Sequence, residues 1–506
     1  MDENVVFKPT NTPSSQPSSS DIPQTSPSSS NLNSPLQSPQ INKESSSTPP
    51  SPPSPPSQAS SLSESPLPKP PVSSQRNVLG LLLKIGIAIL AIAIIVIFIF
   101  KFIVPLFGTS KANKVNLIYW GLWEDKNTMQ KIIDDFQREY PNITVTYIKK
   151  DIRQYRQSLV TQISNGTGPD IYRYHNSWVG MMKSYLSPLS ADVITPDEFK
   201  NLYFPVIQRD LTRNGALYGI PLMIDTLSLF INEELFEAGG NTVPRTWDEF
   251  VRVAKNLVVK DSEGNILTAG AAMGTYDNIT HAPDIIALLF AQNGTNFDNF
   301  QATKVNASQA LQFYTAFAKG EGSVWNDRLD PSVVAFAKGN LAMYFGYSWD
   351  IFTIQSLNKD LRFSVHPVPN LPGRKITIAS YWVEGVSAKS KHQKEAMLFM
   401  KHLAKKDTLQ KLYTEIAKTR SFGELYPRKD LAATLKNNRL VYPFLAQAEF
   451  AISSYFASDT YDEGINMQMN KYLGDAVRSI QTNSSAESAT ETLAQGVQQI
   501  ISKYGQ

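Results

Sequence analysis

The sequence has 506 residues, and its 48 lysines and arginines nearly balance its 45 aspartates and glutamates, which leaves a net charge of +3. So small a charge argues against a nucleic-acid-binding protein, which would need a basic face. The absence of cysteine excludes disulfides, thiolate nucleophiles, cysteine-based metal sites and a lipidated cysteine anchor. The five histidines form no close pair of metal ligands. We therefore expect no metal and no other cofactor.

Residues 1–76 form a tail in which more than half of the positions are proline or serine and few are large and apolar. Such a segment cannot bury enough apolar surface to offset the entropy lost on ordering, so we predict that it is disordered. Its prolines favour extended conformations, which suits a spacer; a peptide ligand for another protein is the alternative.

Residues 78–107 are almost continuously apolar and are long enough to cross a bilayer as one helix. Lys84 and Lys101 interrupt the apolar run, and their long side chains can reach the two membrane interfaces. A cleaved secretory signal would lie near the N-terminus and end in small residues, so we predict an uncleaved transmembrane anchor. Positive charges are nearly balanced on its two sides and do not decide its orientation.

Residues 111–506 are too many for one ordinary core, so we expect two lobes. The first elements of this part alternate between strand and helix, as their hydrophobic periodicity indicates. They are strand 115–120, helix 129–140, strand 143–148, helix 151–164 and strand 170–174. This alternation predicts an α/β fold with a parallel sheet and right-handed crossovers.

The turn Gly-Thr-Gly-Pro at 166–169 ends the second of these helices, and Asp170 after it is expected to be a structural turn residue. Side chains that follow the first and third strands then emerge at one edge of the sheet. Open α/β sheets bind ligands at this edge. The side chains that we expect to meet there are Trp120, Trp123, Glu124, Asn176 and Trp178.

Further along, residues 245–250 have the pattern of a helix-capping box, with Thr246 and Glu249 as its two partners. The helix that this box begins is expected to run to about residue 259. Other predicted elements are a strand at 227–232, a helix at 307–318, a strand within 339–349 and a helix at 390–405.

Seven segments together resemble the family 1 extracellular solute-binding proteins of ABC importers, in the carbohydrate-binding group that is maltose-binding-protein-like. They are YWGLWED, FQREYPNITVTYI, ISNGTGPDIY, LYGIPLMIDTLSLFINEELFEAGG, VPRTWDEF, FAKGNLAMYFGYSW and PVPNLPG. Each segment alone is a weak signal, but all seven occur in the family's order across residues 115–405. The last hundred residues add little to the resemblance beyond helical character.

The resemblance implies a two-lobed periplasmic-binding-protein-like (class II) fold with a hinge, here preceded by the disordered tail and the transmembrane helix. Lobe 1 would comprise about 111–224 and 378–425, and lobe 2 about 226–377 and 426–506. Such a domain works outside the cytoplasm, which implies a cytoplasmic tail and an extracellular binding domain at the cell membrane. Unlike family members released by a cleaved signal or held by a lipidated cysteine, this chain would be held by its own helix.

The resemblance also implies a sugar ligand and ABC permease subunits as partners. If several tryptophans line the cleft, an oligosaccharide is favoured over a monosaccharide; glycerol phosphates, polyamines and peptides are the alternative ligands. A sugar ring has an apolar face that stacks on aromatic rings and hydroxyls that need amide or carboxylate partners. By position in the family's segments, the expected ligand contacts extend to the second lobe and the crossover strands. The complete set is Trp120, Trp123, Glu124, Asn176, Trp178, Asp225, Tyr276, Trp349, Tyr381 and Trp382, with Glu384 as a further polar candidate.

Two other functions remain open from the sequence. A glycoside hydrolase would need a pair of carboxylates, which Glu124, Asp225 and Glu384 could supply. The sequence contains no catalytic motif such as G-x-S-x-G or a P-loop. We therefore expect no catalytic residue. A membrane-tethered sensor would keep the same cleft and use the proline-rich tail to bind a cytoplasmic partner. A phosphate-bearing ligand would need a cation, for which Arg173 and Arg420 are the candidates near the expected loops.

Overall fold

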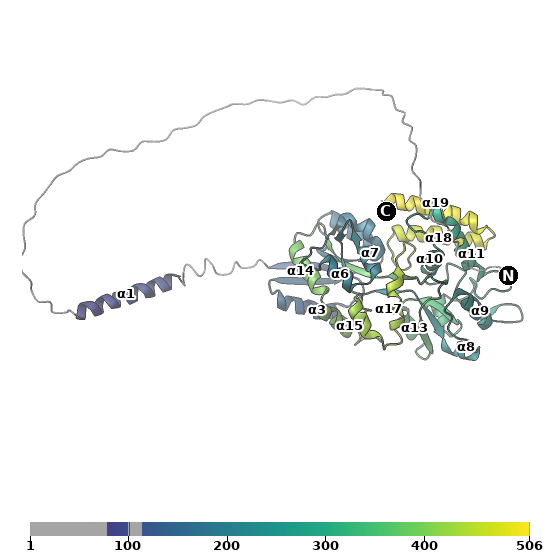
Figure 1. Ribbon diagram of the computed structural model, residues 1–506, viewed down its shortest axis with the longest axis horizontal. Helices are drawn as coiled ribbons and strands as arrows, with labels where there is room; N and C mark the ends of the chain where they lie inside the picture. The colour runs from purple at the N-terminus through teal and green to yellow at the C-terminus, as the bar shows by residue number, and fades with distance from the viewer. Residues whose placement is uncertain (1–77, 100, 102–113, 505–506) are drawn as a thin grey trace, which may run out of the picture. The chain divides into compact units, whose positions relative to one another are not determined.

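The computed structural model describes residues 78–99, 101 and 114–504 (Figure 1). The predicted tail, 1–76, lies outside the described residues. The chain divides into two units, one that contains helix α1 and one that contains every element from β1 onward, and each is described by itself.

The apolar segment forms helix α1 (Val78–Phe98), and its side chains from Leu83 onward are exposed. The predicted membrane span, 78–107, runs past this helix into residues 100 and 102–107, which lie outside the described part of the chain. Among the described residues, no helix combines the length and the apolar character needed to cross a membrane.

The first lobe is built on a six-stranded sheet with the order β2-β1-β3-β15-β4, in which β7 also pairs with β15. As predicted, β1 runs parallel to both β2 and β3, whereas β15 returns antiparallel to β3. The strands are β1 (Val115–Gly121), β2 (Ile143–Lys149), β3 (Ile171–His175), β4 (Leu186–Ser187), β7 (Ile220–Pro221) and β15 (Trp382–Ser387). The hairpin β5 (Thr212–Arg213) and β6 (Ala216–Leu217) lies apart from this sheet.

Helices pack around the first sheet, and Figure 1 shows α3, α6, α7, α14 and α15 gathered in this lobe. The apolar stripe predicted for the first helix is buried, with Met129, Ile133 and Phe136 inside the core. The helices of this lobe are α3 (Lys126–Glu139), α4 (Tyr155–Ser164), α5 (Val179–Met182), α6 (Pro196–Leu202), α7 (Pro205–Leu211), α14 (Gln393–Leu403), α15 (Lys406–Ile416) and α16 (Lys429–Ala432).

The turn between α4 and β3 behaves as the sequence predicts. Gly168 passes so close to the end of α4 that an added Cβ would lie 2.8 Å from the backbone of Ile163. Asp170 is a structural turn residue, because its carboxylate accepts hydrogen bonds from the Ile118 amide at 2.9 Å and from Ser390 Oγ at 2.6 Å. This carboxylate therefore fixes the register at which β3 enters the sheet.

The second lobe holds a three-stranded antiparallel sheet, β12-β9-β13, in which the two predicted strands pair with each other. The capping box at the start of α9 is confirmed, since the Thr246 hydroxyl accepts from the Glu249 amide and the Glu249 carboxylate accepts in return. The strands are β9 (Ser228–Asn232), β10 (Val259–Lys260), β11 (Ile266–Thr268), β12 (Met343–Gly346) and β13 (Phe363–His366). The helices are α8 (Glu233–Ala238), α9 (Trp247–Leu257), α10 (Ala282–Gln292), α11 (Lys304–Ala316), α12 (Ser332–Ala337), α13 (Asp350–Leu357), α17 (Tyr442–Ala446), α18 (Ile465–Gln481) and α19 (Ala486–Tyr504).

The two lobes are joined by a small linking sheet with the order β16-β14-β8. Its strands are β8 (Asp225–Thr226), β14 (Thr377–Ser380) and β16 (Ala451–Ile452). The first two lie where the resemblance implies crossings between the lobes. The third lies at residue 451 rather than near 425, because the chain after residue 425 first stays on the first lobe, where Arg428 bridges to Tyr203. The lobe boundaries given above therefore stay a prediction.

Candidate functional site

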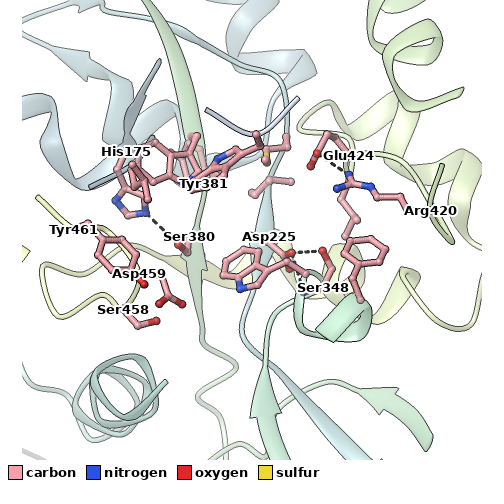
Figure 2. A pocket seen from close by; sticks show the side chains of 18 residues that line it. His175, Asp225, Ser348, Ser380, Tyr381, Arg420, Glu424, Ser458, Asp459 and Tyr461 are labelled. Carbon is pink, nitrogen blue, oxygen red and sulfur yellow. Dashed lines mark hydrogen bonds and ion pairs between the residues drawn. The ribbon is translucent and has the colours of Figure 1, made fainter. Parts of the chain in front are cut away.

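A cavity of about 400 Å³ lies between the two lobes, next to the linking sheet (Figure 2). The first lobe contributes Trp123 from the loop after β1 and His175 from the end of β3. The second lobe contributes Ser348 and Trp349 from the loop after β12, and the linking strands contribute Asp225 and Ser380. The cavity thus lies at the carboxyl ends of parallel strands, the edge that the sequence predicted.

Aromatic rings in fixed orientations form much of the cavity wall. Trp382 packs edge-on against Trp123, with ring centres 5.5 Å apart, and against Trp178 at 5.3 Å. Across the cavity, Trp349 is stacked on Tyr347 with ring centres 4.4 Å apart and planes at 16°. Because neighbouring rings hold them, these indoles offer apolar faces to a ligand with little loss of side-chain freedom.

Asp225 lies on the cavity wall with both carboxylate oxygens already engaged. Oδ2 accepts from the Ser348 amide at 2.9 Å and from the Ser348 hydroxyl, and Oδ1 accepts from the Thr226 amide at 2.8 Å. Burial outweighs these hydrogen bonds and raises the pKa of Asp225 to about 8. The side chain therefore ties the linking sheet to the loop that carries Trp349.

His175 forms the wall on the first-lobe side as a neutral imidazole, because burial lowers its pKa to about 3. Its Nδ1 lies 2.7 Å from Ser177 Oγ and its Nε2 lies 3.1 Å from Ser380 Oγ. Both ring nitrogens are thus used in holding the ring in place.

Arg420 and Glu424 form an ion pair at one side of the cavity, 2.6 Å apart (Figure 2). The guanidinium also donates through Nε to the Phe422 carbonyl at 2.9 Å and lies 4.7 Å above the ring of Phe352. Burial raises the pKa of Glu424, and the charge of Arg420 opposes that shift. The sequence placed Arg420 near an expected loop but gave no sign of this pairing.

A buried ion-pair cluster lies in the first lobe and contains two carboxylates that the sequence suggested for the ligand site. The Arg173 guanidinium binds Glu124 at 2.6 Å through Nη1 and Glu384 at 2.7 Å through Nε, and all three side chains are inaccessible to solvent. A buried guanidinium needs such partners because it cannot lose its proton. Glu124 therefore does not line the cavity, and Arg173 is not available to a phosphate.

Four other predicted residues also lie off the cavity wall. Trp120 is in the core of the first lobe beside Tyr155, and Trp178 is fully buried behind Trp382. Asn176 is occupied by the protein, since its side chain donates to Ser453 Oγ at 2.8 Å and accepts from the Tyr381 amide. Tyr276 packs beside α18, where its hydroxyl donates to the Asn470 carbonyl at 2.8 Å.

The remaining predicted residues line the cavity together: Trp123, Asp225, Trp349, Tyr381 and Trp382. Of these, Tyr381 directs its hydroxyl away to the Asp210 carboxylate, 2.6 Å distant, so that its ring is the part available to the cavity. Their role as ligand contacts stays a prediction.

Sequence reasoning missed the part of the wall that comes from the loop between β16 and α18, namely Ser458, Asp459 and Tyr461. Beneath it, His281 is fully buried, with Nε2 2.8 Å from Asp350 Oδ2 and Nδ1 2.7 Å from Ser458 Oγ. Burial alone would lower the pKa of His281, but the neighbouring carboxylates, Asp350 foremost, raise it to about 9. The one signal in the sequence was a polar and aromatic run, SDTYDEG, in a region without resemblance.

A sequence profile described as bacterial extracellular solute-binding protein matches residues 120–409. The chain belongs to this family. The seven-segment resemblance is thereby confirmed, and this solute-binding protein has sequence relatives that are named for sugars. It is 26% identical over 328 residues to the multiple sugar-binding protein of Streptococcus mutans. The aligned region covers 60% of this chain and 74% of that protein.

Solved structures show the same fold. A cyclo/maltodextrin-binding protein complexed with maltotetraose superimposes with a TM-score of 0.63 and 21% identity, covering 78% of this chain and 99% of the other. The GacH receptor of Streptomyces glaucescens, solved unliganded and with acarbose, superimposes with a TM-score of 0.59 and 20% identity. This superposition covers 77% of this chain and 99% of the receptor chain. These likenesses establish the two-lobed α/β architecture of the solute-binding protein.

Replacing Arg173 by methionine is expected to destabilise the protein by about 3–5 kcal/mol, because Glu124 and Glu384 would stay buried without a countercharge. Urea denaturation followed by tryptophan fluorescence measures the loss. Adding E124Q and E384Q to the R173M variant removes the unpaired charges and is expected to restore part of the stability. A loss below about 1 kcal/mol for R173M alone would contradict the assigned role of the cluster.

The His281 contribution to stability is expected to depend on pH. Its folded pKa of about 9 lies above the ordinary histidine value of 6.5, so the stabilisation is fully present below pH 6.5 and is lost as pH rises through 9. The difference in unfolding free energy between the wild type and H281Q should therefore shrink by roughly 3 kcal/mol between pH 6 and pH 9.5. Denaturation of both proteins across this range tests it, and a constant difference would count against a protonated His281.

Proposed function

We propose that this solute-binding protein captures a neutral carbohydrate, an oligosaccharide rather than a monosaccharide, and delivers it to an ABC importer. The observation that carries the proposal is the pair of opposed indole walls, Trp123 with Trp382 on one side and Trp349 on the other. A sugar ring presents apolar C–H faces, which such walls cover, while its hydroxyls reach the polar groups between them. The names of the relatives, which include a galactooligosaccharide-binding protein and a maltodextrin-binding protein, support the same ligand class.

Binding rather than hydrolysis is supported by the state of the carboxylates. Two of the three that the sequence offered for glycoside hydrolysis, Glu124 and Glu384, are held by Arg173 in the interior of the first lobe. The third, Asp225, is fully engaged by protein hydrogen bonds. A pair of carboxyl groups facing one sugar bond, which hydrolysis requires, does not come from this set.

Capture would proceed by closure of the two lobes about the linking sheet. Each lobe has its own sheet, and the short strands β8, β14 and β16 connect them. A few residues at strand ends can absorb the backbone rotation that such a hinge needs. A sugar that contacts both walls binds the closed state better than the open one, and this difference in affinity drives closure.

The anchor and the importer are the remaining parts of the proposal. The apolar run that includes α1 would hold the binding domain at the outer face of the cell membrane, with the proline-rich tail in the cytoplasm. In this arrangement the permease subunits would receive the sugar from a protein that diffuses in the same membrane. A tethered sensor with the same cavity would instead deliver no sugar.

Calorimetric titration of the purified full-length chain in mild detergent with maltotetraose, mannobiose and raffinose tests the binding function. At least one of these sugars is expected to bind, with no product released. W349A should weaken the binding at least tenfold, because it removes a stacked ring from one wall. F450A, which changes an exposed ring outside the cavity, is the matched control and should bind as the wild type does. Binding to none of the sugars would contradict the proposal.

The anchor is tested in intact cells that make the chain with a tag at residue 1. Protease added outside is expected to degrade the binding domain while the tag stays protected, and deletion of residues 78–107 should move the domain out of the membrane fraction. Recovery of the undeleted chain in the soluble fraction would contradict the anchor without touching the binding proposal.

A further inference from the structure

The loop that joins β16 to α18, residues 453–464, is held by both lobes and is called the strap below. At its start, Ser453 Oγ accepts from the Asn176 side chain of the first lobe at 2.8 Å. In its middle, the second lobe holds Ser458. Near its end, Arg156 of the first lobe donates to the carbonyls of Asp462 and Glu463. The strap therefore passes between the lobes at the mouth of the cavity, with fixed points along its length.

The backbone of the strap is strained where it meets the cavity. Asp459, Tyr461 and Glu463 have φ values of 56°, 47° and 45°, a left-handed conformation that side chains other than glycine seldom adopt. Three such residues in alternation persist only where surrounding contacts determine the conformation. Strain of this kind is typical of segments that present side chains to a ligand.

Those contacts lie directly beneath the strap. The Ser458 amide donates to Asp284 Oδ2 at 3.0 Å, and Ser458 Oγ lies 2.7 Å from His281 Nδ1. His281 is held in turn by Asp350 at 2.8 Å. This buried network fixes the position of Ser458, and with it the direction in which the next side chain, Asp459, points.

Asp459 and Tyr461 both line the cavity and are partly exposed to solvent, by 44% for the Asp459 side chain and 47% for Tyr461. Figure 2 shows them on the side opposite Arg420 and Glu424, with Asp225 between. The Asp459 carboxylate forms a long ion pair with His281 at 3.7 Å but accepts no hydrogen bond from the described residues, and the Tyr461 hydroxyl has no hydrogen-bond partner among them. A carboxyl group with room for further hydrogen bonds and a hydroxyl are thus left for a ligand at this side.

The charges on the wall favour an uncharged ligand. Among the described residues that line the cavity, Arg420 is the cation, and Glu424 already neutralises it. A carboxylate or phosphate on the ligand would meet no unpaired cation among the described residues of the wall and would lie in the same cavity as the Asp459 carboxylate.

We propose that Asp459 and Tyr461 determine specificity by binding hydroxyls at one end of a neutral sugar, and that the cavity rejects sugars carrying a carboxylate or phosphate. The proposal rests on the carbohydrate-binding function given above. It assigns the strap a role distinct from that of the aromatic walls, because Asp459 and Tyr461 are the strap's own cavity-lining groups with hydrogen-bonding capacity left over.

The test uses the full-length chain and the neutral sugar that it binds best among maltotetraose, mannobiose and raffinose, with trigalacturonate as the anionic probe. D459N and Y461F are each expected to weaken the affinity for the neutral sugar at least tenfold. D459G removes the side chain but suits the positive φ, so it is expected to fold with a cooperative unfolding transition while its affinity falls as in D459N. D330N, which changes a surface carboxylate paired with Lys338, is the control and should bind normally.

The outcomes separate the two proposals. If no neutral sugar binds the wild type, the carbohydrate function fails and the role of the strap fails with it. If a neutral sugar binds but D459N and Y461F retain full affinity, the specificity role alone is overturned. If trigalacturonate binds the wild type as tightly as the neutral sugar, the preference for an uncharged ligand is overturned.

Discussion

The ion pairs of Arg173 are the interaction on which the arrangement of the first lobe depends. The guanidinium belongs to β3, its partner Glu384 lies directly opposite in β15, and Glu124 comes from the loop after β1. One buried cation thus joins three segments at the cavity edge of the sheet. Trp123 is adjacent to Glu124, and Trp382 lies two residues before Glu384. The same contacts that satisfy the charge therefore also bring the two indoles together in a T-shaped arrangement. The cost of burying the charge fixes the geometry, because any displacement of one segment leaves a carboxylate or the guanidinium unpaired.

The second lobe meets the cavity through a different kind of contact. There, hydrogen bonds to the buried carboxylates of Asp284 and Asp350, the latter from His281, hold the loop after β12 and the strap. Aromatic stacking of Trp349 on Tyr347 sets the opposite wall. Asp225 connects this side to the linking sheet through Ser348. The two walls thus come from different cores, and the short strands of the linking sheet and the strap connect them. Under the proposed capture mechanism, the linking strands would allow the lobes to rotate while each core stays intact.

Much of the fold follows from patterns in the sequence, because period and turn residues are local. The stripe from Met129 to Phe136, the capping box of Thr246 and Glu249, and the Gly-Pro turn before Asp170 each predict an element that the structure contains. The site was harder to predict. Trp123 and Trp178 both follow strands, yet one faces the cavity and the other is buried behind Trp382, and only tertiary packing separates them. A carboxylate such as Glu124 can accept a hydrogen bond from a sugar hydroxyl, and nothing in the sequence indicates that Arg173 binds it in the interior of the lobe. The strap lay outside the resemblance, and its left-handed backbone has no signature in residues such as Asp459 and Tyr461.

The junction between β14 and β15 makes the linking sheet and the cavity wall one continuous piece of chain. Ser380, Tyr381 and Trp382 follow one another there, the first in the linking sheet and the last in the first lobe, and all three line the cavity. Behind the wall, Tyr381 and Asn176 both donate to Asp210, on the side away from the ligand. Observed affinity in such a receptor is the intrinsic affinity scaled by the fraction of molecules already closed. In the proposed receptor, a substitution at Asp210 or Asn176 would therefore change the observed affinity for a sugar without altering any side chain that lines the cavity.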